Sequence, residues 1–278
     1  MEWSSAGESK NGCASRDLEM NRRREVIQGL WIGGQLSIME QLSITSFLKN
    51  GHEYHLYIYD VTHPVPEGVI VRPASEIVSH ADVFTDRDND LKSSYANFSD
   101  VFRYKLLSQK GGIYADLDIV CLRPFDFESE YVFGSQAMQD VIEETKRFGP
   151  ALLNGNVIKA PAGAEIMNFC YEHSIGRASA DREWFELGPP LLTEAVKKFG
   201  LQTHIHPSCT FNPVDWWSWN EIISDEADVK SKLRFIWSPP VHGVHLWNSM
   251  WNRAGVDKGG EFPRDCLYEE LKRLYLIS

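Results

Sequence analysis

The segment between residues 95 and 122 constrains the fold more than any other. It consists of a predicted helix, two glycines and an apolar run that contains two aspartates. Apolar residues recur at three- and four-residue spacing through 95–110, which predicts an amphipathic helix. Gly111 and Gly112 then supply the residue type that a left-handed helix cap requires. The apolar run 113–122 follows at once. The sequence therefore predicts a helix that is followed directly by a buried strand.

Asp116 and Asp118 stand one residue apart inside that apolar run, and we expect both carboxylates at the edge of the strand. At such an edge two carboxylates can share Mg²⁺ or Mn²⁺, hard cations that often join protein carboxylates to the phosphates of a substrate. An Asp-x-Asp pair by itself fits solvated turn residues equally well. The neighbouring residues therefore decide between these two interpretations.

The start of the chain predicts the strand–helix–strand opening of an open α/β sheet. An apolar run at 26–32 ends at two glycines and predicts a strand, residues 36–49 have near-helical apolar spacing, and 54–59 alternate as a strand does. Residues 60–94 contain three prolines and are predicted to be loop. In an open α/β sheet, ligands bind beyond the carboxyl ends of the strands.

Further elements are predicted in the second half of the chain. A strand ends near Ile158, and helices begin near Glu165 and after the glycine and two prolines at 188–190. A tryptophan-rich segment at 215–220 precedes a predicted strand near 233–237. No repeat and no linker divides these elements.

Composition and charge limit the class of protein. With 278 residues, 43% of them hydrophobic, the chain is long enough for a large core, and we expect one domain over 25–278. Residues 1–24 are rich in Ser, Gly, Asn and charge and predict a disordered lead-in. The net charge of -11 argues against a nucleic-acid partner, because binding to a phosphate backbone needs a basic surface.

The same composition gives an expectation about location. Five cysteines without a Cys-x-x-Cys pair fit a reducing compartment, and we expect a cytoplasmic protein. No apolar stretch approaches the roughly 18 residues of a spanning helix, and the N-terminus has no apolar signal-peptide core. The arginines at 22–24 allow two interpretations, a solvated flank and a peripheral contact with an anionic membrane face. The first is favoured for a single short charge run.

Two polar groups outside the acidic pair are candidates for a site. Asp100 and Arg103 lie three residues apart on the predicted helix, so they share a face. They fit either a surface ion pair or a site in which Asp100 accepts from sugar hydroxyls while Arg103 meets phosphate or sugar oxygens. Residues 244–251 combine His245 with amide, hydroxyl and indole groups, a composition that is typical of carbohydrate recognition.

Taken together, these motifs resemble the signature of the DXD-motif sugar-binding glycosyltransferases, the group that includes yeast mannosyltransferases, α-1,4-galactosyltransferases of glycolipid synthesis and the glucosylating clostridial toxins. The segments that carry the resemblance keep the order of the family and lie at 29–34, 99–104, 111–118, 153–157, 188–193 and 245–248. The resemblance implies a GT-A fold, which is an α/β fold with an open, mixed, mostly parallel sheet flanked by helices. It also implies a nucleotide-sugar donor, a glycan or glycolipid acceptor, a Mn²⁺ or Mg²⁺ cofactor and retention of the anomeric configuration.

The resemblance further implies roles for particular residues. The expected metal ligands are Asp116, Asp118 and His245. The expected donor-binding residues, with Trp31 on the base and Asn248 and Ser249 near the diphosphate, are Trp31, Tyr114, Asp116, Asn248, Ser249 and Trp251. The expected catalytic residues are Asp100, Arg103, Asn154 and Asn156. The last two compete for one position of the family, and their spacing does not choose between them.

Two other classes of protein stay open. Residues 116–120 resemble the nucleophile motif of haloacid-dehalogenase-like phosphatases, in which Asp116 would attack phosphorus and Asp118 would act as acid and base. A non-catalytic sugar-binding module is the second alternative, and it would need the tryptophans but not Arg103. Among the resembled enzymes the donors are UDP-sugars and GDP-mannose, with a UDP-sugar favoured here.

Overall fold

The computed structural model describes residues 24–60, 63–85, 94–138, 152–176 and 187–277. The predicted lead-in therefore lies outside the described residues except for Arg24, whose guanidinium forms an ion pair with Asp126 at 3.6 Å. The described chain forms one seven-stranded sheet, in the order β3-β2-β1-β4-β7-β6-β8, and a separate pair of strands, β5 and β9.

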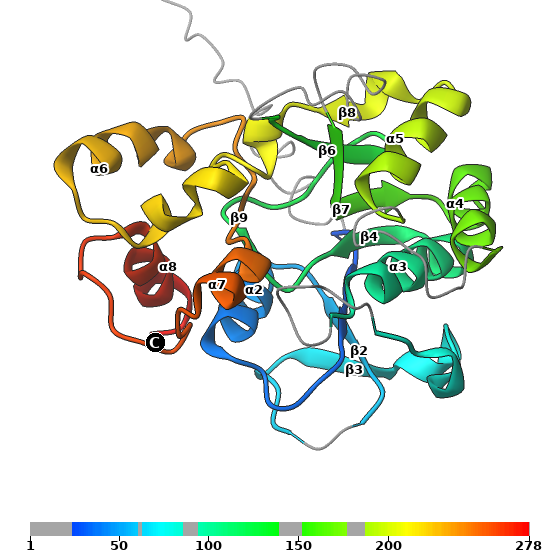
Figure 1. The fold of residues 1–278 in the computed structure, drawn as a ribbon, viewed down its shortest axis with the longest axis horizontal. Coiled ribbons are helices and arrows are strands. Elements are labelled where there is room, and N and C mark those ends of the chain that lie inside the picture. The colour runs from blue at the N-terminus through cyan, green and yellow to red at the C-terminus, as the bar shows by residue number, and fades with distance from the viewer. Residues whose placement is uncertain (1–23, 61–62, 86–93, 139–151, 177–186, 278) are drawn as a thin grey trace, which may run out of the picture.

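The strands and helices follow the chain in the order shown in Figure 1. The strands are β1 (Ile27–Trp31), β2 (Tyr54–Ile58), β3 (Val69–Pro73), β4 (Gly112–Ala115), β5 (Ile119–Cys121), β6 (Val132–Gln136), β7 (Leu152–Ala160), β8 (Ile205–His206) and β9 (Gly243–His245). The α-helices are α2 (Ile38–Lys49), α3 (Ala96–Lys110), α4 (Glu165–Gly176), α5 (Pro189–Lys198), α6 (Ala227–Leu233), α7 (Asn248–Ala254) and α8 (Leu267–Tyr275). The 3₁₀ helices are η2 (Ala74–Glu76), η3 (His80–Asp82), η5 (Gln202–His204), η6 (Ser208–Thr210), η7 (Trp216–Ile223) and η8 (Arg234–Trp237).

The sheet is mixed and mostly parallel, as the sequence predicts. Strand β1 pairs in parallel with β2 and β4, β2 with β3, and β6 with β8, whereas β7 is antiparallel to both β4 and β6. In Figure 1, α3, α4 and α5 gather at one side of the molecule and α2, α7 and α8 at the other. This α/β architecture confirms the expected fold class.

The opening strand–helix–strand unit is confirmed, but β3 was missed. Its sequence lies in the proline-containing stretch that is predicted to be loop. The strand pairs only with β2, at the edge of the sheet, and its side chains are half-buried or exposed. An edge strand tolerates a proline and carries a weak apolar pattern, which is why the sequence did not reveal it.

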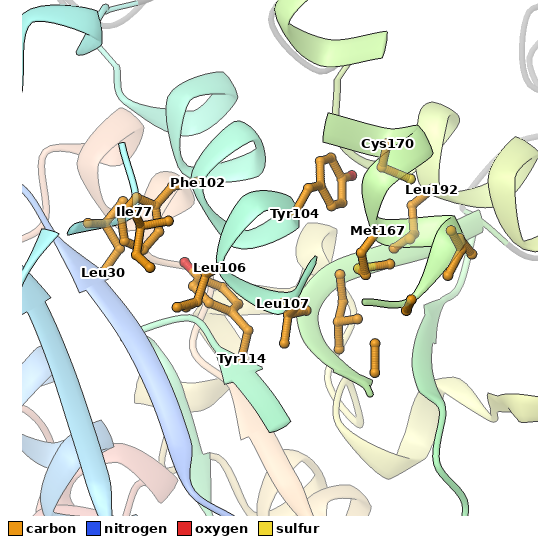
Figure 2. Close-up of a cluster of buried hydrophobic side chains, with 14 of the residues drawn as sticks. Leu30, Ile77, Phe102, Tyr104, Leu106, Leu107, Tyr114, Met167, Cys170 and Leu192 are labelled. Atoms are coloured by element: carbon orange, nitrogen blue, oxygen red, sulfur yellow. The ribbon is translucent and has the colours of Figure 1, made fainter. Parts of the chain in front are cut away.

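Helix α3 connects the two sides of the main core. Figure 2 shows Phe102 beside Leu30 and Ile77, while Tyr104 points toward Met167 and Cys170 of α4. The helix ends at Gly111, whose φ of 64° is positive and where a Cβ would lie 2.4 Å from the backbone nitrogen of Ala162. The predicted glycine stop is confirmed, because no other residue fits this position.

The strand predicted over 113–122 is wrong in one respect, and the error concerns the acidic pair. Strand β4 ends at Ala115, and the chain turns through residues 116–118 before β5 begins. The N–H of Ile119 donates to the carbonyl of Asp116 at 3.1 Å and closes the turn. Strand β5 leaves the main sheet and pairs with β9. Residues 113–115 of β4 and 119–121 of β5 are all buried, so the apolar pattern does not reveal where the hydrogen bonding changes from one sheet to the other.

The strand predicted near 233–237 is also wrong. These residues belong to the end of α6 and to η8. A short apolar run does not distinguish a strand from a buried helical turn, because both can bury consecutive apolar residues. The tryptophan-rich segment forms η7.

The C-terminal helices build a second core cluster. Residues of β9, α7 and α8 pack there with Met39 and Leu42 of α2.

Within the described ranges, no helix is both long and apolar enough to cross a bilayer.

Candidate active site

One cleft of about 810 Å³ gathers most of the predicted site residues. It opens where β1 and β4 end side by side, since parallel strands present their carboxyl ends at the same edge. Its walls include the end of β1, the first two turns of α3, the acidic turn and the start of α7. The predicted site residues that line it are Trp31, Asp100, Arg103, Tyr114, Asp116, Asp118, Asn154, His245, Asn248 and Ser249.

Arg103 is a buried guanidinium whose five N–H groups meet protein acceptors. Its Nη2 donates to Asp116 Oδ1 at 3.1 Å and its Nη1 to the carbonyl of Gly155 at 2.5 Å. A second bond from Nη1 reaches Asp116, and Nε and Nη2 bind the carbonyl and hydroxyl of Ser99. Asp100 lies 3.4 Å from Nε. Arg103 is 5% exposed, so the surface ion pair considered from the sequence is wrong.

Glycines allow this network to form. A Cβ on Gly155 would lie 2.6 Å from Arg103 Nη1, and a Cβ on Gly188 would lie 2.7 Å from an oxygen of Asp100. Both distances are shorter than real Cβ contacts. The glycines of the motifs at 153–157 and 188–193 are therefore needed for the close approach of backbone to these two charged side chains.

Asp116 is bound by Arg103 and Tyr114. Besides Arg103, the hydroxyl of Tyr114 donates to its Oδ1 at 3.1 Å, and the Tyr114 ring lies 4.8 Å from the Arg103 guanidinium carbon. Burial, together with the nearby charge of Asp118, raises the pKa of Asp116 and outweighs the lowering by Arg103. Burial lowers the pKa of Arg103, but the acidic neighbours reverse the direction and raise it.

Asp118 faces His245 across the junction between β5 and β9. Its Oδ2 lies 3.1 Å from His245 Nε2 and accepts from the backbone N–H of Asn248 at 2.9 Å. The register pairs Ile119 with His245, which fixes this approach. The structure thus brings together two predicted ligands that lie far apart in the sequence.

The two aspartates differ in the direction of their pKa shifts. Burial acts to raise the pKa of Asp118, but His245, the Asn248 N–H and Lys258 together lower it below its usual value. Asp116 shifts in the opposite direction. Neighbouring carboxylates with opposed shifts have different environments and are suited to different roles.

Trp247 holds His245 from the side. Its φ of 57° and ψ of 52° lie in the left-handed region, which is uncommon for a bulky residue. Its ring centroid lies 3.8 Å from that of His245, and its Nε1 donates to the carbonyl of Val214 at 2.8 Å. The strained turn aims the N–H of Asn248 at Asp118.

The structure separates the two competing asparagines. Asn154 lines the cleft, and its Nδ2 donates to Gln136 Oε1 at 2.6 Å. Asn156 is fully buried, and its Nδ2 lies 3.0 Å from His245 Nδ1. Of the two alternatives that the sequence leaves open, Asn154 therefore lies at the cleft, and Asn156 is buried outside its lining. Residues two apart share a face in a regular strand, but β7 is irregular where it pairs with β6.

Trp251, which was expected to bind the donor, does not line the cleft. Its side chain has no exposed surface, its ring packs against Phe262 and Tyr268, and its Nε1 donates to the carbonyl of Leu246 at 2.7 Å. It belongs to the C-terminal core and not to the cleft. Aromatic composition alone did not distinguish a stacking tryptophan from a core tryptophan.

The donor set fits a hard divalent cation only in part. Carboxylate and imidazole ligands suit Mn²⁺, and Asp118 and His245 already face each other. Asn212 Oδ1 lies 3.0 Å from His245 Nδ1, and an Nδ1–H donated to it leaves the Nε2 lone pair for a cation. Asp116 is bound to Arg103 instead. In the part of the chain that the structure describes, no three His, Cys, Asp or Glu side chains are grouped as a metal site.

Sequence reasoning missed several cleft residues. Gln136 and Glu40 line the cleft without a local motif that marks them. Trp216 and Tyr95, both 38% exposed, present aromatic rings to it. The tryptophan-rich composition of 215–220 was the one available signal, and it did not identify which ring faces the cleft.

The comparison with protein families agrees with this geometry. Residues 39–143 match the family described as glycosyltransferase sugar-binding region containing DXD motif. This segment includes nearly all of α2, the whole of α3 and the acidic turn. The resemblance inferred from the sequence is therefore confirmed over residues 39–143, which match a DXD-containing sugar-binding region.

Among solved structures, the chain is similar to the PaToxG glycosyltransferase. The identity is 16%, the alignment covers 91% of this chain and 85% of that chain, and the TM-score is 0.43. A likeness this distant transfers no property to the chain. Among curated proteins, none matches.

Proposed function

We propose that this protein is a metal-dependent retaining glycosyltransferase that moves a hexose from a nucleotide sugar, with a UDP-sugar favoured, to a glycan or glycolipid acceptor. The observation that carries the proposal is the cleft in which Asp118, His245 and Arg103 converge beyond the ends of β1 and β4. Retention of configuration and the hexose class rest on the family resemblance.

The chemistry requires stabilisation of the leaving nucleoside diphosphate. Mn²⁺ or Mg²⁺, held by Asp118 and His245 with Asp116 on the same turn, would supply Lewis-acid stabilisation of the negative charge that develops there. Asn248 and Ser249 at the start of α7 line the cleft and offer an amide and a hydroxyl to the phosphate oxygens.

The residues of α3 and β7 would position the donor sugar. Arg103 holds the Asp116 carboxylate and the Gly155 carbonyl in place, so we assign it an orienting role and no direct phosphate contact. Asn154 and Gln136 form a hydrogen-bonded pair on the same wall and would bind sugar hydroxyls. Trp31, at the end of β1, would stack on the base.

For the acceptor we propose a stacking contact on Trp216. Its ring is exposed at the cleft and belongs to η7, which follows β8 at the opposite end of the sheet order from β3. The apolar face of a sugar ring stacks favourably on an indole.

We further propose that residues 25–278 act as one domain in the cytoplasm, where a reducing environment suits the spacing of the cysteines.

The test is release of nucleoside diphosphate from a panel of UDP- and GDP-sugars in the presence of Mn²⁺. Asp118→Asn keeps the shape of the side chain and removes its charge, so kcat/KM should fall by about a hundredfold or more, equivalent to ~2.7 kcal/mol. The matched control is Asp126→Asn, which changes an acidic side chain that does not line the cleft. Excess EDTA should abolish turnover. Full turnover by Asp118→Asn, or in EDTA, would overturn the proposal.

The phosphatase alternative receives no support from the site. A nucleophilic carboxylate needs a free oxygen, whereas Asp116 accepts from Arg103 at both oxygens and from Tyr114 at one. Release of inorganic phosphate from phosphomonoesters would favour it. Sugar binding without turnover of any donor would favour the binding module.

A further inference from the structure

A lysine behind the cleft has no part in the function proposed above. Lys258 lies in the turn that follows α7, and its side chain is 16% exposed. Its Nζ donates to Glu40 Oε1 at 2.8 Å and to Asn248 Oδ1 at 2.9 Å. Glu40 and Asn248 line the cleft, whereas Lys258 does not. The ammonium group therefore contacts the cleft wall from behind.

Glu40 and Lys258 are both fixed to secondary structure. Glu40 is 1% exposed, and its second oxygen accepts from the N–H of Ser37 at 2.6 Å as part of the N-terminal cap of α2. The carbonyl of Lys258 accepts from the hydroxyl of Tyr268 on α8 at 3.0 Å. A charged pair that is buried this far is rigid, because neither partner can leave without exposing an unpaired charge to the interior.

The contact with Lys258 decides the orientation of the Asn248 amide. An ammonium group only donates, so it selects the carbonyl oxygen of the amide and not its nitrogen. Because Oδ1 accepts from Lys258, Nδ2 is the end of the amide that can donate to a group in the cleft. The backbone N–H of the same residue binds Asp118 at 2.9 Å. Asn248 is thus held at its side chain by Lys258 and at its backbone by the acidic turn.

We propose that Lys258, held by Glu40, is a positioning residue that presents the Asn248 amide as a fixed hydrogen-bond donor to the diphosphate of the donor. The inference rests on the proposed function, because it assigns the anion to a nucleoside diphosphate. The ammonium charge also adds positive potential directly behind the site of the anion.

The test is calorimetric titration of UDP and of GDP, each with Mn²⁺, into the full chain. Lys258→Met should weaken the affinity of the better ligand by about tenfold, or ~1.4 kcal/mol. Lys258→Arg should restore most of the affinity, because its fork can still bridge Glu40 and Asn248. Lys258→Met leaves a buried carboxylate unpaired and could lower stability. The double variant Lys258→Met/Glu40→Gln removes that charge, so it should have wild-type thermal stability and the same loss of nucleotide affinity.

A double-mutant cycle separates positioning from a purely structural effect. Asn248→Ala should also weaken binding by about tenfold, and Lys258→Met added to it should have no further effect, because the lysine acts through the asparagine. The matched control is Lys272→Met. Lys272 pairs with Glu269 at 2.5 Å, is 18% exposed and lies on α8 away from the cleft. Its variant should bind with unchanged affinity.

The outcomes are distinguishable. Wild-type affinity in Lys258→Met, or an equal loss on top of Asn248→Ala, would overturn the positioning role and leave the proposed function standing. Failure of the wild-type chain to bind UDP or GDP with Mn²⁺ would overturn the proposed function and this inference with it.

Discussion

Arg103 illustrates how a residue's partners define its role. Its five N–H groups are matched by oxygens of Ser99, Asp116 and Gly155, so the guanidinium connects α3, the acidic turn and β7. A lysine ammonium has three donors and no planar fork. The geometry of the acidic turn therefore depends on the shape of this side chain as well as on its charge.

Arg103→Lys should lower kcat/KM for nucleotide-sugar turnover by roughly tenfold or more, equivalent to ~1.4 kcal/mol, because Asp116 and Gly155 lose bonds that one ammonium cannot replace. Arg123→Lys is the matched control. Arg123 also donates to two backbone carbonyls, those of Val241 and Trp237, but does not line the cleft. It should lose stability and keep its kcat/KM. Equal kinetic losses in both variants would assign the effect of Arg103 to general stability.

Among the elements, the site is built where the seven-stranded sheet meets the β5–β9 pair. The main sheet supplies Asp116 at the end of β4, and the β5–β9 pair supplies Asp118 and His245. The carbonyl of Asp118 also accepts from the N–H of Leu246 at 2.8 Å. The turn between β4 and β5 therefore lets two aspartates on one short segment face different partners.

Helix η7 carries Trp216, the residue that we propose stacks on the acceptor. Trp216→Ala should raise the KM for a glycan acceptor by about tenfold through loss of a stacking surface, while acceptor-independent hydrolysis of the donor stays unchanged. The matched control is Phe235→Ala on η8, where the ring is 43% exposed and does not line the cleft. Steady-state kinetics with varied acceptor measure the effect. A proportional loss of donor hydrolysis would show that Trp216 does not act on the acceptor.

Over the whole molecule, three buried or half-buried histidines make stability depend on pH. Burial lowers the pKa of His52, His206 and His242 below 6.5. The neutral ring of His52 is fixed at both nitrogens, since Nδ1 lies 3.0 Å from the carbonyl of Glu25 and Nε2 accepts from the N–H of Phe125 at 2.9 Å. The rings of His206 and His242 pack on Phe127.

The direction of the pH effect follows from proton linkage. Between the lowered folded pKa values and 6.5, the unfolded chain binds more protons than the folded chain, so stability rises with pH in that window and falls on acidification. The melting temperature should therefore be a few degrees lower at pH 5.5 than at pH 7.5, because each kcal/mol of lost stability lowers it by about 2–4 °C. We expect one cooperative transition, in keeping with the single domain that we propose.

His52→Gln tests the contribution of the most buried ring. Glutamine keeps a donor and an acceptor but does not titrate, so the melting temperature of the variant should depend less on pH than that of the wild type. Differential scanning calorimetry at several pH values measures both slopes. Parallel slopes would show that His52 is not among the groups responsible.

The features that depend on local sterics and burial could be predicted from the sequence. The sequence predicted the glycine stop after α3, the α/β class and the motifs that carry the family resemblance, because backbone freedom and apolar periodicity are local properties. It also identified Asp118 and His245 as partners, but only through that resemblance. Their approach to 3.1 Å comes from the pairing of β5 with β9.

The direction of polar side chains, and the sheet that a buried segment joins, became apparent only in the folded structure. The structure separated Asn154 from Asn156, moved Trp251 into the core and placed Lys258 behind Asn248. Apolar periodicity reports how deeply a segment is buried, but not which strand its hydrogen bonds reach. The orientation of an amide or an indole depends on partners from distant parts of the chain, and these become neighbours only when the chain is folded.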